Sequence, residues 1–233
     1  MTTFLRGAAL TTATTLGHAD NSDLGPTEGS GFYRAWPEDL AAIQELGVTD
    51  VRITLDWARL QPKPGMLDDD WSEWFEHLLA AADAIGLRAW ATLLDASTPR
   101  WFDNDGGFAD DANFERWWPR WVGAAADRFG DHVGGWIPFV ALPSAAWQQP
   151  WADTWNALRG DAPVVRSVDP TLIEPASLSA DQQNATGLVT RIGDGPEHLG
   201  QLLRDAAEAA DGPVIVSTLR DDADATSTDD LLT

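Results

Sequence analysis

Two aspartates, Asp56 and Asp95, have the side chains whose chemistry would matter most if the fold brings them together. Two carboxylates at one site can act as a general acid and a general base. The alternative is a structural role, in which a buried arginine, Arg52, pairs with one of the aspartates or the aspartates face solvent. The residue types alone leave both interpretations open.

Aromatic residues are the second group that could contact a ligand. The chain has thirteen tryptophans, far more than 233 residues usually contain. Tryptophan rings either fill cores or stack on ligands, sugar rings among them. Trp57, Trp101 and Trp147 are the candidates for a wall on which a ring would stack. Core packing is the commoner role, so we expect it for most of the thirteen.

The sequence does not show the pattern of a metal or cofactor site. It has no cysteine, which excludes disulfides, thiolate metal ligands and cysteine catalysis. Acidic runs such as Asp68 to Asp70 are typical of solvated surfaces. The four histidines have no ligand spacing, and they are His18, His77, His132 and His198. We therefore expect no metal and no cofactor.

The charge balance restricts the partners of the protein. With Lys+Arg 15 against Asp+Glu 37, the formal net charge is −22. Such a field repels polyanions, so nucleic acid and membranes are not expected partners. Residues 1–9 are too weakly apolar for a signal peptide, and no stretch is long enough to span a bilayer. These features predict a soluble, cytoplasmic protein.

Strand and helix patterns alternate along the first 142 residues. Strands are expected where β-branched or alternating apolar residues occur, and helices where apolar residues recur every three or four positions. The expected strands are 4–10, 51–57, 87–94 and 133–142, and the expected helices are 36–46, 71–84 and 114–129. This alternation predicts a parallel sheet with helices outside it, either an open doubly wound sheet or a closed barrel.

The pattern weakens in the second part of the chain. Residues 144–184 contain four prolines and few periodic segments, so we expect them to be irregular. A strand at 187–192, a helix at 196–210 and a strand at 213–219 are expected to follow. Residues 220–233 are an acidic tail. The length is that of one domain, so we expect residues 1–233 to fold as a single unit.

Five stretches of the chain match motifs of one enzyme family. Residues 51–62, Val-Arg-Ile-Thr-Leu-Asp-Trp-Ala-Arg-Leu-Gln-Pro, give the strongest match, to the motif Y-R-F-S-I-A-W-S-R-I-x-P. Residues 4–17 follow F-L-x-G-A-A-T-A-A-Y-Q-I-E-G in frame, and residues 91–102 follow V-T-L-x-H-W-D-L-P-x-W. With 128–133 (F-G-D-R-V) and 212–218 (G-P-I-Y-I-T-E), the chain resembles glycoside hydrolase family 1, the β-glucosidase family.

The resemblance implies a fold. It covers about residues 1–143 and 189–233, and the family has considerably more chain between these two parts. It therefore implies a (β/α)8 TIM-barrel-like fold of the α/β class, with missing or eroded barrel units. In such a barrel the site lies at the C-terminal ends of the strands.

The resemblance also implies that the catalytic machinery is altered. A retaining β-glycosidase needs two carboxylates about 5 Å apart, and in this family both are glutamates. Here Leu142 lies at or near the position of the acid/base, and Thr218 lies at the position of the nucleophile. A threonine hydroxyl without an activating base is a poor nucleophile. The family positions thus supply no catalytic residue.

Most sugar-binding positions of the family differ as well. The Gln and Glu of the first strand fall on Thr14 and Leu16, and the His and Trp of the third strand fall on Asp95 and Ala96. The matching arginine is retained as Arg52, which in an active relative would lie close to the nucleophile. By the same resemblance, both candidate aspartates should lie near the barrel mouth.

From these residues we predict a β-glucosidase-like protein that has lost the retaining mechanism, a pseudoenzyme. Its expected ligand is a small glycoside or another small molecule, and its expected ligand-binding residues are Arg52, Trp57, Asp95, Trp101 and Trp147. One alternative is a diverged glycoside hydrolase that uses relocated carboxylates at the two candidate aspartates. Another is a protein that forms homo-oligomers, because missing barrel units would expose strand edges.

Overall fold

Four strands form the main sheet of the protein. The structure is a computed structural model and describes residues 7–17, 25, 30–95, 97–139, 154, 156–158, 162–164, 166–168 and 186–188. The sheet is parallel, in the order β1-β2-β3-β4, with β1 at Gly7–Leu10, β2 at Asp50–Thr54, β3 at Arg88–Thr92 and β4 at Gly135–Trp136. Three long helices follow successive strands, α2 (Phe32–Glu45), α4 (Asp69–Ala84) and α6 (Asp111–Phe129). The shorter elements are α1 (Thr12–Thr15), α3 (Trp57–Leu60), α5 (Arg100–Asn104), η1 (Gly107–Ala109) and η2 (Gly130–His132).

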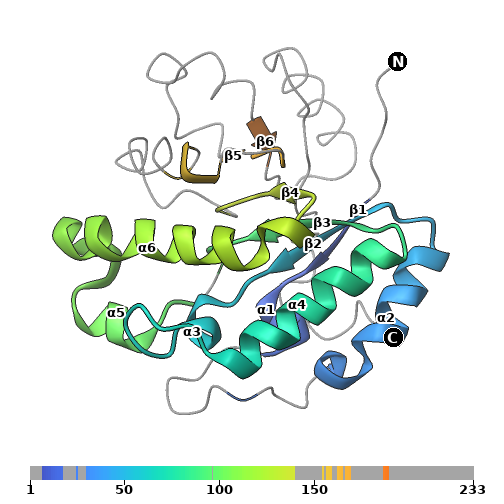
Figure 1. Cartoon of the computed structure of the whole chain (residues 1–233), viewed down its shortest axis with the longest axis horizontal. Helices are drawn as coiled ribbons and strands as arrows, with labels where there is room; N and C mark the ends of the chain where they lie inside the picture. Colours follow the sequence, from blue (N-terminus) through green and yellow to red (C-terminus); the bar gives the residue numbers. More distant parts are fainter. Residues whose placement is uncertain are drawn as a thin grey trace, which may run out of the picture.

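The strand order distinguishes the two folds that the sequence pattern leaves open. Each strand pairs in parallel with the preceding one, so Leu10 lies opposite Ile53, Ile53 opposite Ala91, and Ala91 opposite Trp136. A doubly wound sheet reverses its strand order at the middle, whereas a (β/α)8 barrel keeps it sequential. Figure 1 shows α4 and α6 side by side along the strands, with α2 next to α4. The described residues therefore form part of a barrel, and the expected fold class is confirmed.

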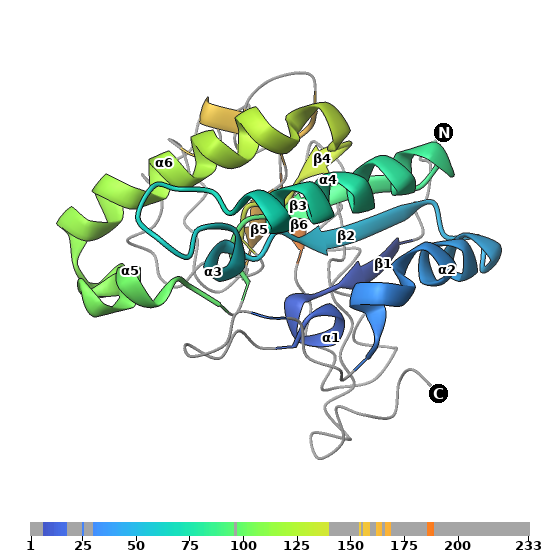
Figure 2. The ribbon, with the colours of Figure 1, turned by 60° about the horizontal axis from the view of Figure 1, so that its bottom comes forward.

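A second, two-stranded sheet continues this order. Strand β5 (Arg166–Val168) pairs in parallel with β6 (Thr186–Leu188). Trp136 of β4 forms a parallel bridge with Val164, and its N–H donates to the Pro163 carbonyl at 2.8 Å. Figure 1 shows β5 and β6 above β4, on the side away from β2. The turned view of Figure 2 shows α4 and α6 side by side over the main sheet. The segment 144–184, expected to be irregular, therefore contains a strand, and the expected strand at 187–192 overlaps β6. The elements expected after residue 195 and the acidic tail lie outside the described residues.

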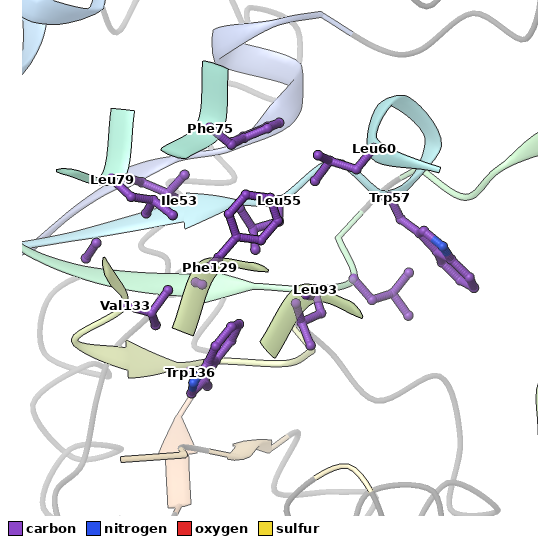
Figure 3. Packing of buried hydrophobic residues seen from close by; sticks show 14 of the residues in the cluster. Ile53, Leu55, Trp57, Leu60, Phe75, Leu79, Leu93, Phe129, Val133 and Trp136 are labelled. Carbon is purple, nitrogen blue, oxygen red and sulfur yellow. The ribbon is translucent and has the colours of Figure 1, made fainter. Parts of the chain in front are cut away.

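The hydrophobic core lies between the strands and the helices. Ile53 of β2 and Leu55, the residue after its end, point toward Phe75 and Leu79 of α4 and Phe129 of α6 (Figure 3). Each of these five side chains is at most 2% exposed. Their burial removes apolar surface from water at about 25 cal/mol per Å², which is the main stabilisation of the layer.

The opposite face of the strands is also buried but carries polar groups. All five residues of β2 are buried, and side chains alternate between faces along a strand. Asp50, Arg52 and Thr54 therefore share the face away from the helices. Trp90 of β3, opposite Arg52 in the register, forms a small cluster of its own with Ile137. This second face positions the candidate site.

Several element boundaries differ from the sequence-based expectation. Within the expected strand 133–142, the described residues form a strand only at Gly135–Trp136. Helix α2 begins at Phe32, one turn before the expected start, so Pro37 lies inside it rather than in its first turn. Strand β2 ends at Thr54, although the pattern predicts a strand to residue 57. Its continuation is cut short because the Asp56 side chain accepts a hydrogen bond from the Ala58 N–H at 3.1 Å and caps α3.

A buried carboxylate links the N-terminal ends of β2 and β3. Asp50 Oδ1 accepts hydrogen bonds from Arg88 Nε at 2.6 Å and Trp90 Nε1 at 2.7 Å, and Oδ2 accepts one from Thr49 Oγ1 at 2.6 Å. Burial by itself raises the pKa of Asp50, but the hydrogen bonds from Arg88, Thr49 and Trp90 together outweigh it, so the pKa is lowered. The N-terminal ends of the strands form the face of a (β/α)8 barrel opposite the site, where such a network stabilises the fold.

Asp50→Asn should lower the free energy of unfolding at pH 7 by about 2 kcal/mol, because the hydrogen bonds to a charged acceptor are lost. The lowered pKa means that the contribution of Asp50 is fully present above the unfolded value near pH 4 and is lost as the pH falls toward the folded value. Urea denaturation at pH 7, 4 and 3 should therefore show the difference between wild type and variant shrinking below pH 4. The exposed Asp83→Asn is the control. A difference that stays constant with pH would contradict the prediction.

Candidate functional site

The candidate site lies at the C-terminal ends of β2 and β3. Arg52 and Thr54 lie two residues apart on β2 and so share one face. Thr54 is opposite Thr92, the last residue of β3, and Asp95 follows three residues later. The Thr54 hydroxyl donates a hydrogen bond to Asp95 Oδ2 at 3.2 Å. The fold thus brings Arg52, Thr54 and Asp95 together, as the strand ends predict.

The electrostatics of this group join a buried cation to a partly exposed anion. Arg52 is 5% exposed, whereas Asp95 is half-buried. Desolvation lowers the pKa of Arg52, and the attraction of the Asp95 carboxylate opposes that shift. Of the two partners that the sequence allows for Arg52, Asp95 is the one whose charge acts on it. Thr92, fully buried beside Thr54, has a hydroxyl that makes no hydrogen bond within the described part of the chain.

Asp56, the other candidate acid or base, has a structural role. It is 1% exposed, and Arg59 Nη1 donates to its Oδ2 in a buried ion pair. Its Oδ1 accepts from the Ala58 N–H at 3.1 Å and from the Ser97 hydroxyl at 2.8 Å. Both oxygens are engaged, and Asp56 pairs with Arg59 rather than with Arg52. Within the described part of the chain, Asp56 is thus buried and hydrogen-bonded on both carboxylate oxygens.

Arg59 is the residue that the sequence reasoning missed. Its side chain is fully buried and binds three backbone carbonyls, with Nη1 donating to Gly17 at 3.1 Å and Nη2 donating to Leu16 and Gly25, each at 3.1 Å. It therefore fixes the segment after β1 against the end of β2. The available signal was its spacing of three residues from Asp56, which on a helical turn brings the two charges together.

Trp57 belongs to the core. It is 1% exposed, its ring stacks on Trp121 at 5.8 Å between centroids, and it contacts Phe102 at 4.8 Å. Its Nε1 donates to Gln61 Oε1 at 3.0 Å. The sequence left stacking on a ligand and core packing open for this residue. The enclosed ring offers no face to a ligand, which fits the packing interpretation.

Trp101 lies at the edge of the same aromatic cluster. It is half-buried, its Nε1 donates to the Gln61 carbonyl at 2.8 Å, and its ring meets Trp57 edge-on at 6.2 Å and Trp117 at 4.9 Å. Trp101 lies in α5, and these contacts join it to α3 and to α6. Trp101 is thus held by the aromatic cluster, although part of its ring stays accessible.

Several positions from the sequence analysis cannot be placed. Leu142, Trp147 and Thr218 lie outside the described residues, as does Ala96. Leu16, at the position of a family sugar-binding glutamate, is 1% exposed and part of the hydrophobic core. A buried aliphatic side chain at this position offers no hydrogen bond to a sugar hydroxyl.

Two further features of the described ranges concern metal ions and membranes. Among these residues, no group of three or more His, Cys, Asp or Glu side chains has the arrangement of a metal site. In the same part of the chain, none of the helices has both the length and the apolar character needed to cross a membrane.

Two relatives of the chain carry the name beta-glucosidase. The chain is 27% identical over 124 residues to the beta-glucosidase of Agrobacterium sp. (strain ATCC 21400). The aligned region covers 53% of this chain and 25% of that enzyme. The chain is 28% identical over 109 residues to the cytosolic beta-glucosidase of Homo sapiens, covering 46% of this chain and 23% of that protein. The matched region therefore spans about a quarter of the length of these relatives.

Solved structures support the same fold. The apo structure of beta-glucosidase 1317 superposes with a TM-score of 0.73 at 17% identity, covering 92% of this chain and 78% of that one. Beta-glycosidase BGL167 gives a TM-score of 0.66 at 18% identity, covering 91% and 76%. At these identities the likeness shows the fold alone.

The family model described as Glycosyl hydrolase family 1 matches residues 13–151, which is more than half of the sequence. This chain belongs to glycosyl hydrolase family 1.

Proposed function

We propose that the protein is a catalytically inactive, β-glucosidase-like member of the family that binds a small glycoside at Arg52, Thr54 and Asp95. The observation that carries the proposal is the state of the two candidate carboxylates. Retaining hydrolysis requires a pair of carboxylates about 5 Å apart, one of them free to attack the sugar. Asp56 is bound on both oxygens, so Asp95 is left without a partner aspartate at this group.

The resemblance to the family supports the same proposal. The acid/base and nucleophile positions correspond to Leu142 and Thr218, neither of which has a carboxylate. The polar groups around Arg52 nevertheless suit recognition of hydroxyl groups. Asp95 is an acceptor, Arg52 is a donor, and the Thr92 hydroxyl can serve as either. A ligand can therefore be held where no bond to it is cleaved.

Purified protein should release no p-nitrophenol above an enzyme-free blank from p-nitrophenyl β-glucoside, β-galactoside or β-fucoside. The reason is the missing carboxylate pair, because removal of either partner abolishes the two-step mechanism. An active member of the family, measured in the same plates, is the positive control. Asp95→Asn is measured beside the wild type. Turnover in the wild type that disappears in this variant would contradict the proposal and favour a hydrolase that uses a relocated carboxylate.

Compartment and self-association remain predictions. A cytoplasmic location agrees with the name of the cytosolic beta-glucosidase of Homo sapiens. Self-association has one structural feature in its favour. Strand β1 pairs only with β2 within the described ranges, and Gly7 and Ala9 on it are exposed. An exposed strand edge can accept a further strand.

A further inference from the structure

Asp95 and Arg52 lie at different depths of the same site. Arg52 is two residues before Thr54 on β2, so its Cα is about 6.6 Å farther from the strand end at a rise of 3.3 Å per residue. Asp95 lies beyond the end of β3 and is half-buried, whereas Arg52 is 5% exposed. A ligand that enters from the C-terminal ends of the strands therefore meets the carboxylate before the guanidinium.

The hydrogen-bonding state of Asp95 determines what it can bind. The Thr54 hydroxyl donates to its Oδ2 at 3.2 Å, and Oδ1 makes no hydrogen bond among the described residues. An ionised carboxylate only accepts hydrogen bonds, so the group of a ligand at Oδ1 must be a donor. A ligand oxygen without a hydrogen is repelled there, while a hydroxyl or an ammonium group is attracted.

Charge distinguishes between those two donors. A hydroxyl and an ammonium group each form a charge-assisted hydrogen bond with the carboxylate, and the ammonium group adds the Coulomb attraction between two opposite charges. The net charge of −22 also raises the local concentration of cations around the protein. The buried Thr92 hydroxyl, which makes no hydrogen bond within the described ranges, lies opposite Thr54 in the register of the sheet.

We propose that Asp95 makes this site select a protonated amine over the corresponding hydroxyl, so that amino sugars or other amine-bearing glycosides are its preferred ligands. Asp95 is thus the residue that determines specificity. The inference rests on the proposed function, because it requires that the site binds a glycoside.

The test compares two ligands that differ in one group. Methyl β-glucoside and methyl 2-amino-2-deoxy-β-glucoside are titrated by calorimetry at one ionic strength and at a pH at which the amine is protonated. The wild type should bind the amino compound at least about tenfold more tightly. Asp95→Asn should bring the ratio of the two dissociation constants close to one, because the variant keeps the size of the side chain and removes its charge.

Two further variants serve as controls for the Asp95→Asn measurement. Asp95→Glu retains the charge and should retain the preference, which guards against a variant that merely disturbs the fold. Asp83→Asn removes one exposed charge on α4 and should leave the ratio unchanged. Equal binding of both glycosides by the wild type, or a preference that survives in Asp95→Asn, would overturn the inference and leave the proposed function standing. Binding of neither glycoside would overturn both.

Discussion

Replacing Arg59 with methionine should lower the free energy of unfolding by about 3–5 kcal/mol, because the substitution leaves the Asp56 carboxylate buried without its counter-charge. The same change removes three hydrogen bonds to the carbonyls of Leu16, Gly17 and Gly25. Guanidinium chloride denaturation at pH 7, followed by tryptophan fluorescence, measures the loss. We expect the midpoint to fall without a change in slope, which would mark lower stability rather than a different unfolded state.

A surface ion pair provides the matched control for Arg59. Arg128 Nη2 donates to Glu76 Oε2 at 2.7 Å, but both side chains are partly exposed. Arg128→Met should therefore cost at most about 1 kcal/mol. The double variant Asp56→Asn with Arg59→Met should recover part of the loss, since the buried unpaired charge is removed. An Arg59→Met cost no greater than that of Arg128→Met would show that the pair does not hold the segment after β1.

Trp57→Ala should cost about 3–5 kcal/mol, the range for truncation of a large buried aromatic side chain. The ring fills the space between Trp121 and Phe102 and is 1% exposed, so its removal leaves a cavity. Thermal and chemical denaturation measure the change. Trp117, which is half-buried, is the matched control, and Trp117→Ala should cost less than half as much.

A second substitution of Trp57 distinguishes core packing from ligand binding. Trp57→Phe keeps most of the apolar volume but loses the hydrogen bond from Nε1 to Gln61. It should lower stability modestly and leave the affinity for any bound glycoside unchanged. A variant that folds normally but loses ligand affinity would return Trp57 to the ligand-binding residues that the sequence suggested.

The four strands and three long helices of the first 139 residues could be predicted from local pattern, whereas the short helices could not. Helices α4 and α6 begin and end within three residues of the expected bounds, because their apolar stripes and first-turn acidic caps at Asp68 and Asp110 are local features. The strand order could not be predicted this way. Periodicity records which face is buried, whereas the choice between barrel and doubly wound sheet depends on which strands become neighbours.

The candidate site was predictable in part from the family motifs. Arg52 and Asp95 were identified because residues 51–62 and 91–102 resemble two motifs of glycoside hydrolase family 1, in which Arg52 is retained and Asp95 replaces a histidine. The pairing of Asp56 with Arg59 was missed because the expected strand extended to residue 57, which would place those side chains on different faces. In the structure, Asp56 caps the short helix α3, and this helical turn places the Arg59 side chain next to Asp56. The end of β2 at Thr54 therefore determines which side chain pairs with Asp56.

The sequential strand order also has a consequence for how the chain folds during synthesis. Paired residues in neighbouring strands are separated by 43, 38 and 45 positions, as Leu10 with Ile53, Ile53 with Ala91 and Ala91 with Trp136 show. Each of β2, β3 and β4 therefore leaves the ribosome when its neighbour has already been made. The entropic cost of closing each loop is nearly the same, because it grows only with the logarithm of loop length. The sheet can be extended one strand at a time, in the order of translation, without waiting for the C-terminal end of the chain.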